Sequence, residues 1–79
     1  MPITKAANAI ANRVPTLRAF VLMTLKAAPM TADEVAQAMR ESILAVRPRV
    51  TELNKLGLIA DTGKRRANDS GRTAIVWKA

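Results

Sequence analysis

Apolar residues recur every three or four positions through most of the chain, which is the spacing of helices that bury one face. The first such segment predicts a helix from Pro15 or Thr16 to Ala27. Proline suits the first turn, where its missing N–H has no intrahelical partner. Pro29 ends the helix, because the residue before a proline is pushed out of the α region. The predicted buried stripe comprises Leu17, Phe20, Val21 and Leu25.

A second helix has a clear start signal. Thr31 to Glu34 form a capping box, in which the threonine hydroxyl and the glutamate carboxylate each accept from the other residue's backbone N–H. Asp33 and Glu34 also complement the positive end of the helix dipole, so we expect them to cap the helix and lie in solvent. The helix should end near Arg40 or Glu41. Its inward side should carry Val35, Ala38 and Met39.

A third helix is expected after a turn that runs from Glu41 to Leu44 or Ala45. Pro48 would then fall in the first turn, where a proline is tolerated. Gly57 is placed to end the helix in the left-handed conformation. The buried stripe of this helix is predicted to be Val46, Val50, Leu53 and Leu56.

After Gly57 the apolar period changes from 3.6 to 2, which indicates strands. Residues 58–62 and 73–78 read as two strands, separated by a polar, basic and glycine-bounded segment. This is the pattern of a β-hairpin with a long loop, whose turn is formed by residues 68–71. Trp77 on the second strand is expected to pack into the core rather than to stack on a ligand.

Residues 15–78, with their three helices, Leu-Gly-Leu-Ile segment and basic hairpin, resemble the winged helix-turn-helix superfamily. Residues 46–59 and 71–77 are similar to small DNA-binding proteins of phages and prophages. The resemblance implies an α+β domain over residues 15–79, with a three-helix core followed by a two-stranded hairpin, the wing. It also implies that the third helix enters the major groove, while the wing touches the adjacent minor groove or the backbone.

Residues 1–14 precede this domain and carry apolar residues at helical spacing. The segment is predicted to be an N-terminal arm or a short extra helix. Thirteen or fourteen residues are marginal for an isolated helix, so order there would require packing.

Composition removes several classes of function. The 79 residues contain no cysteine and no histidine, so the usual zinc sites and the Ser-His and Cys-His nucleophiles are not available. We therefore expect neither an enzyme nor a bound metal or cofactor. No apolar run approaches the roughly 18 to 20 residues that span a bilayer. A cytoplasmic protein of a bacterial host cell, with no membrane partner, is expected.

Charge points to a polyanion as the partner. The chain has thirteen basic and six acidic residues, a net charge of +7. Residues 42–79 hold eight basic and three acidic groups, so +5 of that excess lies in the half with the third helix and the hairpin. Neutralisation of phosphate with release of counterions supplies most non-specific affinity for nucleic acid.

The third helix carries the predicted base contacts. Arg47 and Thr51 lie one turn apart on its solvent side, and these side chains can contact a guanine edge and a base or thymine methyl. Lys55, a further turn along, is expected to meet phosphate. Arg49 lies beside the apolar stripe, so it either pairs with Glu52 or an acid of the second helix, or contacts DNA. The alternative for the whole row is a solvated basic face.

The wing carries the predicted backbone contacts, which are Lys64, Arg65, Arg66 and Arg72. Together these features predict a non-catalytic protein that binds double-stranded DNA, as a phage or prophage transcriptional regulator. A homodimer fits this interpretation, since one helix reads only a few base pairs. Two alternatives remain: a protein-interaction module that binds a host polymerase, nuclease or replication protein, and an architectural DNA-binding protein.

Overall fold

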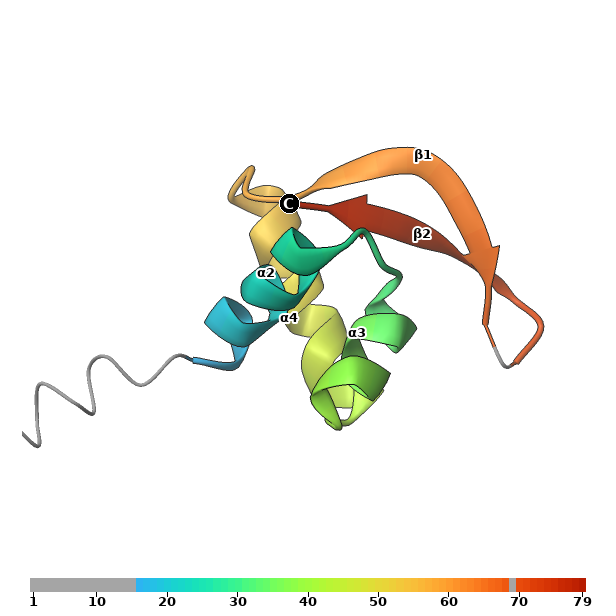
Figure 1. Ribbon diagram of the computed structural model, residues 1–79, viewed down its shortest axis with the longest axis horizontal. Helices are drawn as coiled ribbons and strands as arrows, with labels where there is room; N and C mark the ends of the chain where they lie inside the picture. Colours follow the sequence, from blue (N-terminus) through green and yellow to red (C-terminus); the bar gives the residue numbers. More distant parts are fainter. Residues whose placement is uncertain (1–15, 69) are drawn as a thin grey trace, which may run out of the picture.

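The computed structural model describes residues 16–68 and 70–79. Three helices, α2 (Leu17–Ala27), α3 (Ala32–Met39) and α4 (Ile43–Lys55), precede two strands, β1 (Ala60–Ala67) and β2 (Thr73–Lys78). The strands form one antiparallel sheet, which extends from the helices past α3 as a curved hairpin (Figure 1). This is the predicted α+β, winged-helix arrangement. The predicted arm or helix over residues 1–14 lies outside the described residues.

Side-chain caps fix where the first two helices begin. The Thr16 hydroxyl accepts from the Ala19 N–H at 3.2 Å at the start of α2. The predicted capping box at α3 is present: the Glu34 N–H donates to Thr31 Oγ1 at 3.1 Å, and the Thr31 N–H donates to Glu34 Oε1 at 2.9 Å. These caps satisfy N–H groups that have no partner within the helix.

The predicted start of α4 was too late. Its N-cap is Ser42, whose Oγ accepts from the Leu44 N–H at 3.1 Å, because serine caps a helix far better than alanine. Pro48 consequently lies inside the helix rather than in its first turn. A proline there cannot donate to the carbonyl of Leu44, four residues earlier, so α4 lacks one hydrogen bond on its solvent side.

The core lies between the three helices and the chain that follows α4. Two residues of the predicted stripes are largely exposed, Phe20 at 44% and Leu56 at 58%. On α3 the buried alanine is Ala36 rather than Ala38. Leu56 is exposed because α4 ends at Lys55, before the stripe completes another turn. The cluster of buried side chains comprises Val21, Leu25, Val35, Ala36, Val46, Val50, Leu53 and Ile59.

Both α3 and α4 end in the same motif, with a left-handed residue after the last turn. At α4 this residue is Gly57, with φ of +75°; its N–H donates to Asn54, and the next N–H donates to Leu53, both at 3.0 Å. At α3 the left-handed residue is Arg40, with φ of +56°. Glycine adopts this conformation without cost, whereas an arginine does not.

The hairpin has a longer first strand than the sequence predicts. β1 runs to Ala67, so the basic segment belongs to the strand and not to a long loop. Two extra residues of β1 are accommodated in a bulge between Asp61 and Arg65. There the Thr62 hydroxyl donates to the Val76 carbonyl at 2.7 Å, and Gly63 has φ of +84°. The tight turn is where predicted, closed by hydrogen bonds among Asn68, Gly71 and Arg72.

The base of the wing is joined to the helices through Met30. Its N–H donates to the Trp77 carbonyl at 3.0 Å, and the Trp77 N–H donates back at 2.8 Å, which forms an isolated antiparallel bridge. The Trp77 side chain is half-buried and packs against the core, as predicted. Val76 beside it is only 2% exposed. The base of β2 is therefore held by both backbone and side-chain contacts.

The two left-handed helix ends allow a matched pair of substitutions. Arg40→Gly should raise the free energy of unfolding by about 1 kcal/mol, because it removes the strain of a left-handed arginine. Gly57→Ala should lower it by about the same amount, since a Cβ at Gly57 would meet no atom within 4 Å and the cost is confined to the backbone.

Urea unfolding followed by circular dichroism measures both changes at unaltered m-value. A shift of the same sign in the two variants would contradict the assignment of backbone strain at Arg40.

Candidate functional site

One face of α4 presents the three residues predicted to touch DNA. Arg47, Thr51 and Lys55 are all exposed and follow one another at four-residue intervals, a row about 12 Å long. The opposite face buries Val46, Val50 and Leu53. We call this exposed row the reading face. Packing of the buried face against α2 and α3 fixes the direction in which the reading face points.

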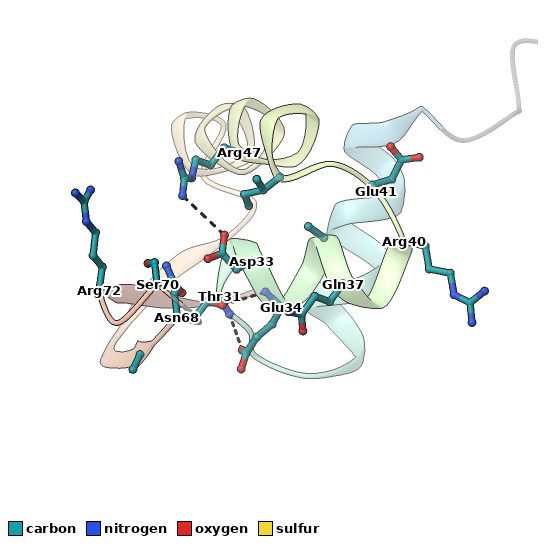
Figure 2. Close-up of a pocket in the computed structure, with 13 residues that line it drawn as sticks. Thr31, Asp33, Glu34, Gln37, Arg40, Glu41, Arg47, Asn68, Ser70 and Arg72 are labelled. Carbon is teal, nitrogen blue, oxygen red and sulfur yellow. Dashed lines mark hydrogen bonds and ion pairs between the residues drawn. The ribbon is translucent and has the colours of Figure 1, made fainter.

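Thr51 and Arg47 on this face are already in contact with other groups. The Thr51 hydroxyl donates to the Arg47 carbonyl at 3.2 Å, so it presents acceptor lone pairs and a methyl group to solvent. Arg47 Nη2 lies 3.8 Å from Asp33 Oδ1 of α3 (Figure 2). The Arg47 side chain is still 62% exposed, and an exposed pair at this distance restrains it weakly. Arg47 thus remains accessible to a ligand.

Arg49 pairs with Glu52 in the predicted i,i+3 geometry. Arg49 Nη2 donates to Glu52 Oε2 at 2.9 Å, while Nε lies 2.8 Å from Oε1 without the alignment of a hydrogen bond. Glu52 Oε1 also lies 3.8 Å from Arg18 Nη1 of α2. Glu52 therefore links α2 to α4. Contact of Arg49 with DNA stays a prediction.

Two of the four wing cations predicted to contact DNA have carboxylate partners. Arg65 donates through Nη1 and Nη2 to the two oxygens of Asp61 at 3.0 and 3.1 Å. Arg66 donates through Nη1 to both oxygens of Glu34 at 2.6 and 2.7 Å, which joins β1 to the first turn of α3. These charge-assisted bonds neutralise both guanidinium groups within the protein.

The same pairs change the titration of the carboxylates. The hydrogen bonds from Arg66 are the largest cause that lowers the pKa of Glu34; partial burial opposes them and the Thr31 N–H adds to them. The pKa of Asp61 is also lowered, chiefly by Arg65 and next by the Gly63 N–H. Both carboxylates are therefore held in the charged form by groups of the folded protein.

The other two wing cations are exposed and have no carboxylate within 4 Å among residues 16–68 and 70–79. They are Lys64, at the bulge of β1, and Arg72, at the hairpin tip. The Arg72 side chain extends from the hairpin at the edge of the view in Figure 2. Lys55 on the reading face is likewise exposed and has no carboxylate partner in that part of the chain.

An open groove lies between α3, the start of α4 and the hairpin tip. Its volume is about 870 Å³, and it is lined by Arg47 from α4 and by Arg72 from the hairpin (Figure 2). Asp33 and Glu34 line its floor, so the groove carries both signs of charge. It separates the reading face from the exposed cation of the wing tip.

Sequence reasoning offered an acid of α3 as a partner of Arg49, but it did not find the pair between Glu34 and Arg66. It identified Glu34 as a capping residue, which is correct, but Glu34 and Arg66 are 32 positions apart and no local pattern joins them. Asp61 and Arg65 are four positions apart, a spacing that indicates a pair on a helix but not on a strand. The bulge brings them together.

Comparison with family models, with curated proteins and with solved structures found no match. Among the residues that the structure describes, no helix is both long and apolar enough to cross a bilayer. Function is therefore inferred from the side chains of α4 and the wing.

The Glu34 pair predicts how stability depends on pH. Because folding lowers the pKa of Glu34 below its ordinary value of 4.5, the contribution of the pair is complete above that range and is lost as the pH falls through the lowered pKa. Between pH 7 and pH 3, wild type should lose about 0.5 to 1 kcal/mol more than Glu34→Gln, the scale of a solvent-screened pair.

Urea titrations at each pH give the two curves, and glutamine keeps the capping box. Glu41→Gln is the matched control, since Glu41 is exposed and has no ion-pair partner in the described part of the chain. Parallel curves for wild type and Glu34→Gln would count against the pair.

Proposed function

We propose that the protein binds double-stranded DNA through the reading face of α4, without catalysis. The observation that carries this proposal is the row of Arg47, Thr51 and Lys55, exposed along one side of a helix whose other side is buried. A helix of 13 residues is about 20 Å long, and its diameter of about 10 to 12 Å matches the width of the major groove.

The chemistry of the row supports an order of contacts along α4. Arg47 lies nearer the N-terminus of α4, where its guanidinium can donate two hydrogen bonds to the O6 and N7 atoms of guanine. Thr51, with a free lone pair and a methyl group, can accept from a base or contact a thymine methyl. Lys55, in the last turn, supplies a point charge for phosphate.

The wing supports the same proposal through its charge. β1 and the hairpin tip carry four basic residues, and β2 attaches them to the helical body next to α3. Cations on both sides of a groove suit a polyanion that passes over it, with major-groove contacts from α4 and backbone or minor-groove contacts from the wing.

We further propose a role as a transcriptional regulator of the kind that phages and prophages encode. Its support is the resemblance of residues 46–59 and 71–77 to such proteins, together with side chains suited to read base edges. An architectural protein would bind random and selected duplexes equally and bend both. Selection from a random duplex pool separates the two roles, since a regulator yields a defined motif.

A second candidate function is contact with a protein, including a second copy of this chain. Five large apolar side chains are exposed in the described part of the chain: Phe20, Met23, Leu44, Leu56 and Leu58. Such residues favour protein contact where they gather in one patch. Light scattering after size exclusion measures self-association, and binding that is insensitive to salt and independent of DNA would support this candidate.

Arg47→Ala should weaken binding to the selected motif by about 1 to 3 kcal/mol and relax the preference at one base pair. The reason is the loss of a bidentate contact to a base edge. Fluorescence anisotropy against the motif and its single-base variants measures both effects. Equal loss on every sequence would assign Arg47 to phosphate instead.

Lys55→Ala should weaken all duplexes alike and reduce the slope of log K against log salt by about 0.9. Lys26→Ala is the control for charge, because Lys26 is an exposed lysine in the last turn of α2, outside the reading face. Wild-type affinity in Arg47→Ala and Lys55→Ala over several salt concentrations would falsify DNA binding by α4.

A further inference from the structure

We propose that Arg66 and Glu34 form a strut that sets the orientation of the wing, and that Lys64 and Arg72 make the phosphate contacts of the wing. Arg66 is then a positioning residue that acts through the protein rather than a group that touches DNA. The inference rests on the proposed function and divides the four wing residues predicted to contact DNA, Lys64, Arg65, Arg66 and Arg72, into two pairs with different roles.

The geometry of the pair is that of a fixed contact. One guanidinium nitrogen of Arg66 donates to both oxygens of Glu34, at 2.6 and 2.7 Å, which is at the short end of charge-assisted hydrogen bonds. By contrast, the contact between Arg47 and Asp33 in the same groove is 3.8 Å long. The first contact is hydrogen-bonded to both carboxylate oxygens, whereas the second is an ion pair longer than a hydrogen bond.

Glu34 is itself held in place, which distinguishes this pair from two mobile surface side chains. Its Oε1 accepts from the Thr31 N–H at 2.9 Å, and Thr31 is 1% exposed. The capping box therefore fixes the carboxylate before Arg66 meets it. A surface ion pair normally costs side-chain entropy, because two long side chains must be held in one geometry. Glu34 is already restrained by the capping box, so its share of this cost is small.

The strut attaches the wing at a second point along its length. The first attachment is at the base, where Trp77 pairs with Met30. Arg66 lies opposite Ala74, three residues from Trp77 towards the tip, and reaches α3 from there. Two attachments at different heights fix the angle between the hairpin and the helices. That angle sets the separation between Arg72 and the reading face.

Charge gives an independent reason to remove Arg66 from the DNA contacts. A cation adds to the salt dependence of binding when it releases counterions from phosphate. Arg66 and Arg65 are already neutralised by Glu34 and Asp61, so phosphate would have to displace a carboxylate from each. Lys64 and Arg72 have no carboxylate partner among the described residues. They can therefore contact phosphate without the displacement of a carboxylate.

The salt slope tests this division. The double variant Glu34→Gln with Arg66→Ala replaces a neutral ion pair with two neutral side chains, so the net charge is unchanged and glutamine keeps the capping box. We expect it to lower affinity roughly two- to fivefold, the size of an exposed ion pair, with the slope unchanged. Arg72→Ala and Lys64→Ala should each reduce the slope by about 0.9. A reduction of that size in the double variant would overturn the proposal.

Hydrogen exchange of the free protein separates this test from the proposed function. The double variant should exchange the amides of β1 and β2 faster than wild type near the hairpin tip, while Arg72→Ala should leave them unchanged. Equal exchange in wild type and the double variant would refute the strut whether or not DNA binds. Absence of binding by wild type to any duplex would refute the proposed function, while faster exchange would still support the strut.

Discussion

The structure depends on the short segment that joins α2 to α3, where a capping box and the residue before it contact three parts of the protein. The Thr31 hydroxyl starts α3, and its side chain is buried. Its neighbour Met30 pairs through its backbone with Trp77, which attaches the sheet. Glu34, the partner in the capping box, accepts from Arg66 of the wing. Loss of this cap would therefore disturb both the start of α3 and the carboxylate that Arg66 contacts, directly beside the residue that attaches the sheet.

Helix α4 combines a regularly packed buried face with a proline in its interior. Its buried face needs a regular helix to place three aliphatic side chains in the core, yet Pro48 removes a hydrogen bond from its interior. Pro48 lies on the exposed side between Arg47 and Thr51, so the missing bond is at the solvent side and leaves the packed face continuous. Proline also stiffens the backbone that carries the reading face, since its φ is fixed. Pro48 thus lowers the stability of α4 but restricts the backbone that carries Arg47 and Thr51.

The parts of the fold that could be predicted from the sequence are those determined by residues close together in the chain. The capping box, the left-handed Gly57 and the limits of β2 follow from residues within a few positions of one another, and all were predicted correctly. The errors in the start of α4 and in the length of β1 concern competition between local signals. Ser42, rather than the predicted Ala45, is the N-cap of α4, because its hydroxyl accepts a hydrogen bond from the Leu44 N–H and alanine has no such acceptor. Likewise the side chains of Asp61 and Thr62 supply hydrogen bonds for a bulge, so β1 continues where glycine had suggested a loop.

The candidate site was less predictable, because its charges are paired across distant parts of the chain. A count of basic residues treats Arg66 and Arg72 alike, although Arg66 is hydrogen-bonded to Glu34 whereas Arg72 is exposed. Only the tertiary structure separates cations that hold the protein together from cations that are exposed to a ligand. The net charge of +7 therefore describes the attraction of the whole molecule for a polyanion at long range. At close range, Glu34 and Asp61 pair with Arg66 and Arg65, while Lys64 at the bulge and Arg72 at the tip have no carboxylate partner among residues 16–68 and 70–79.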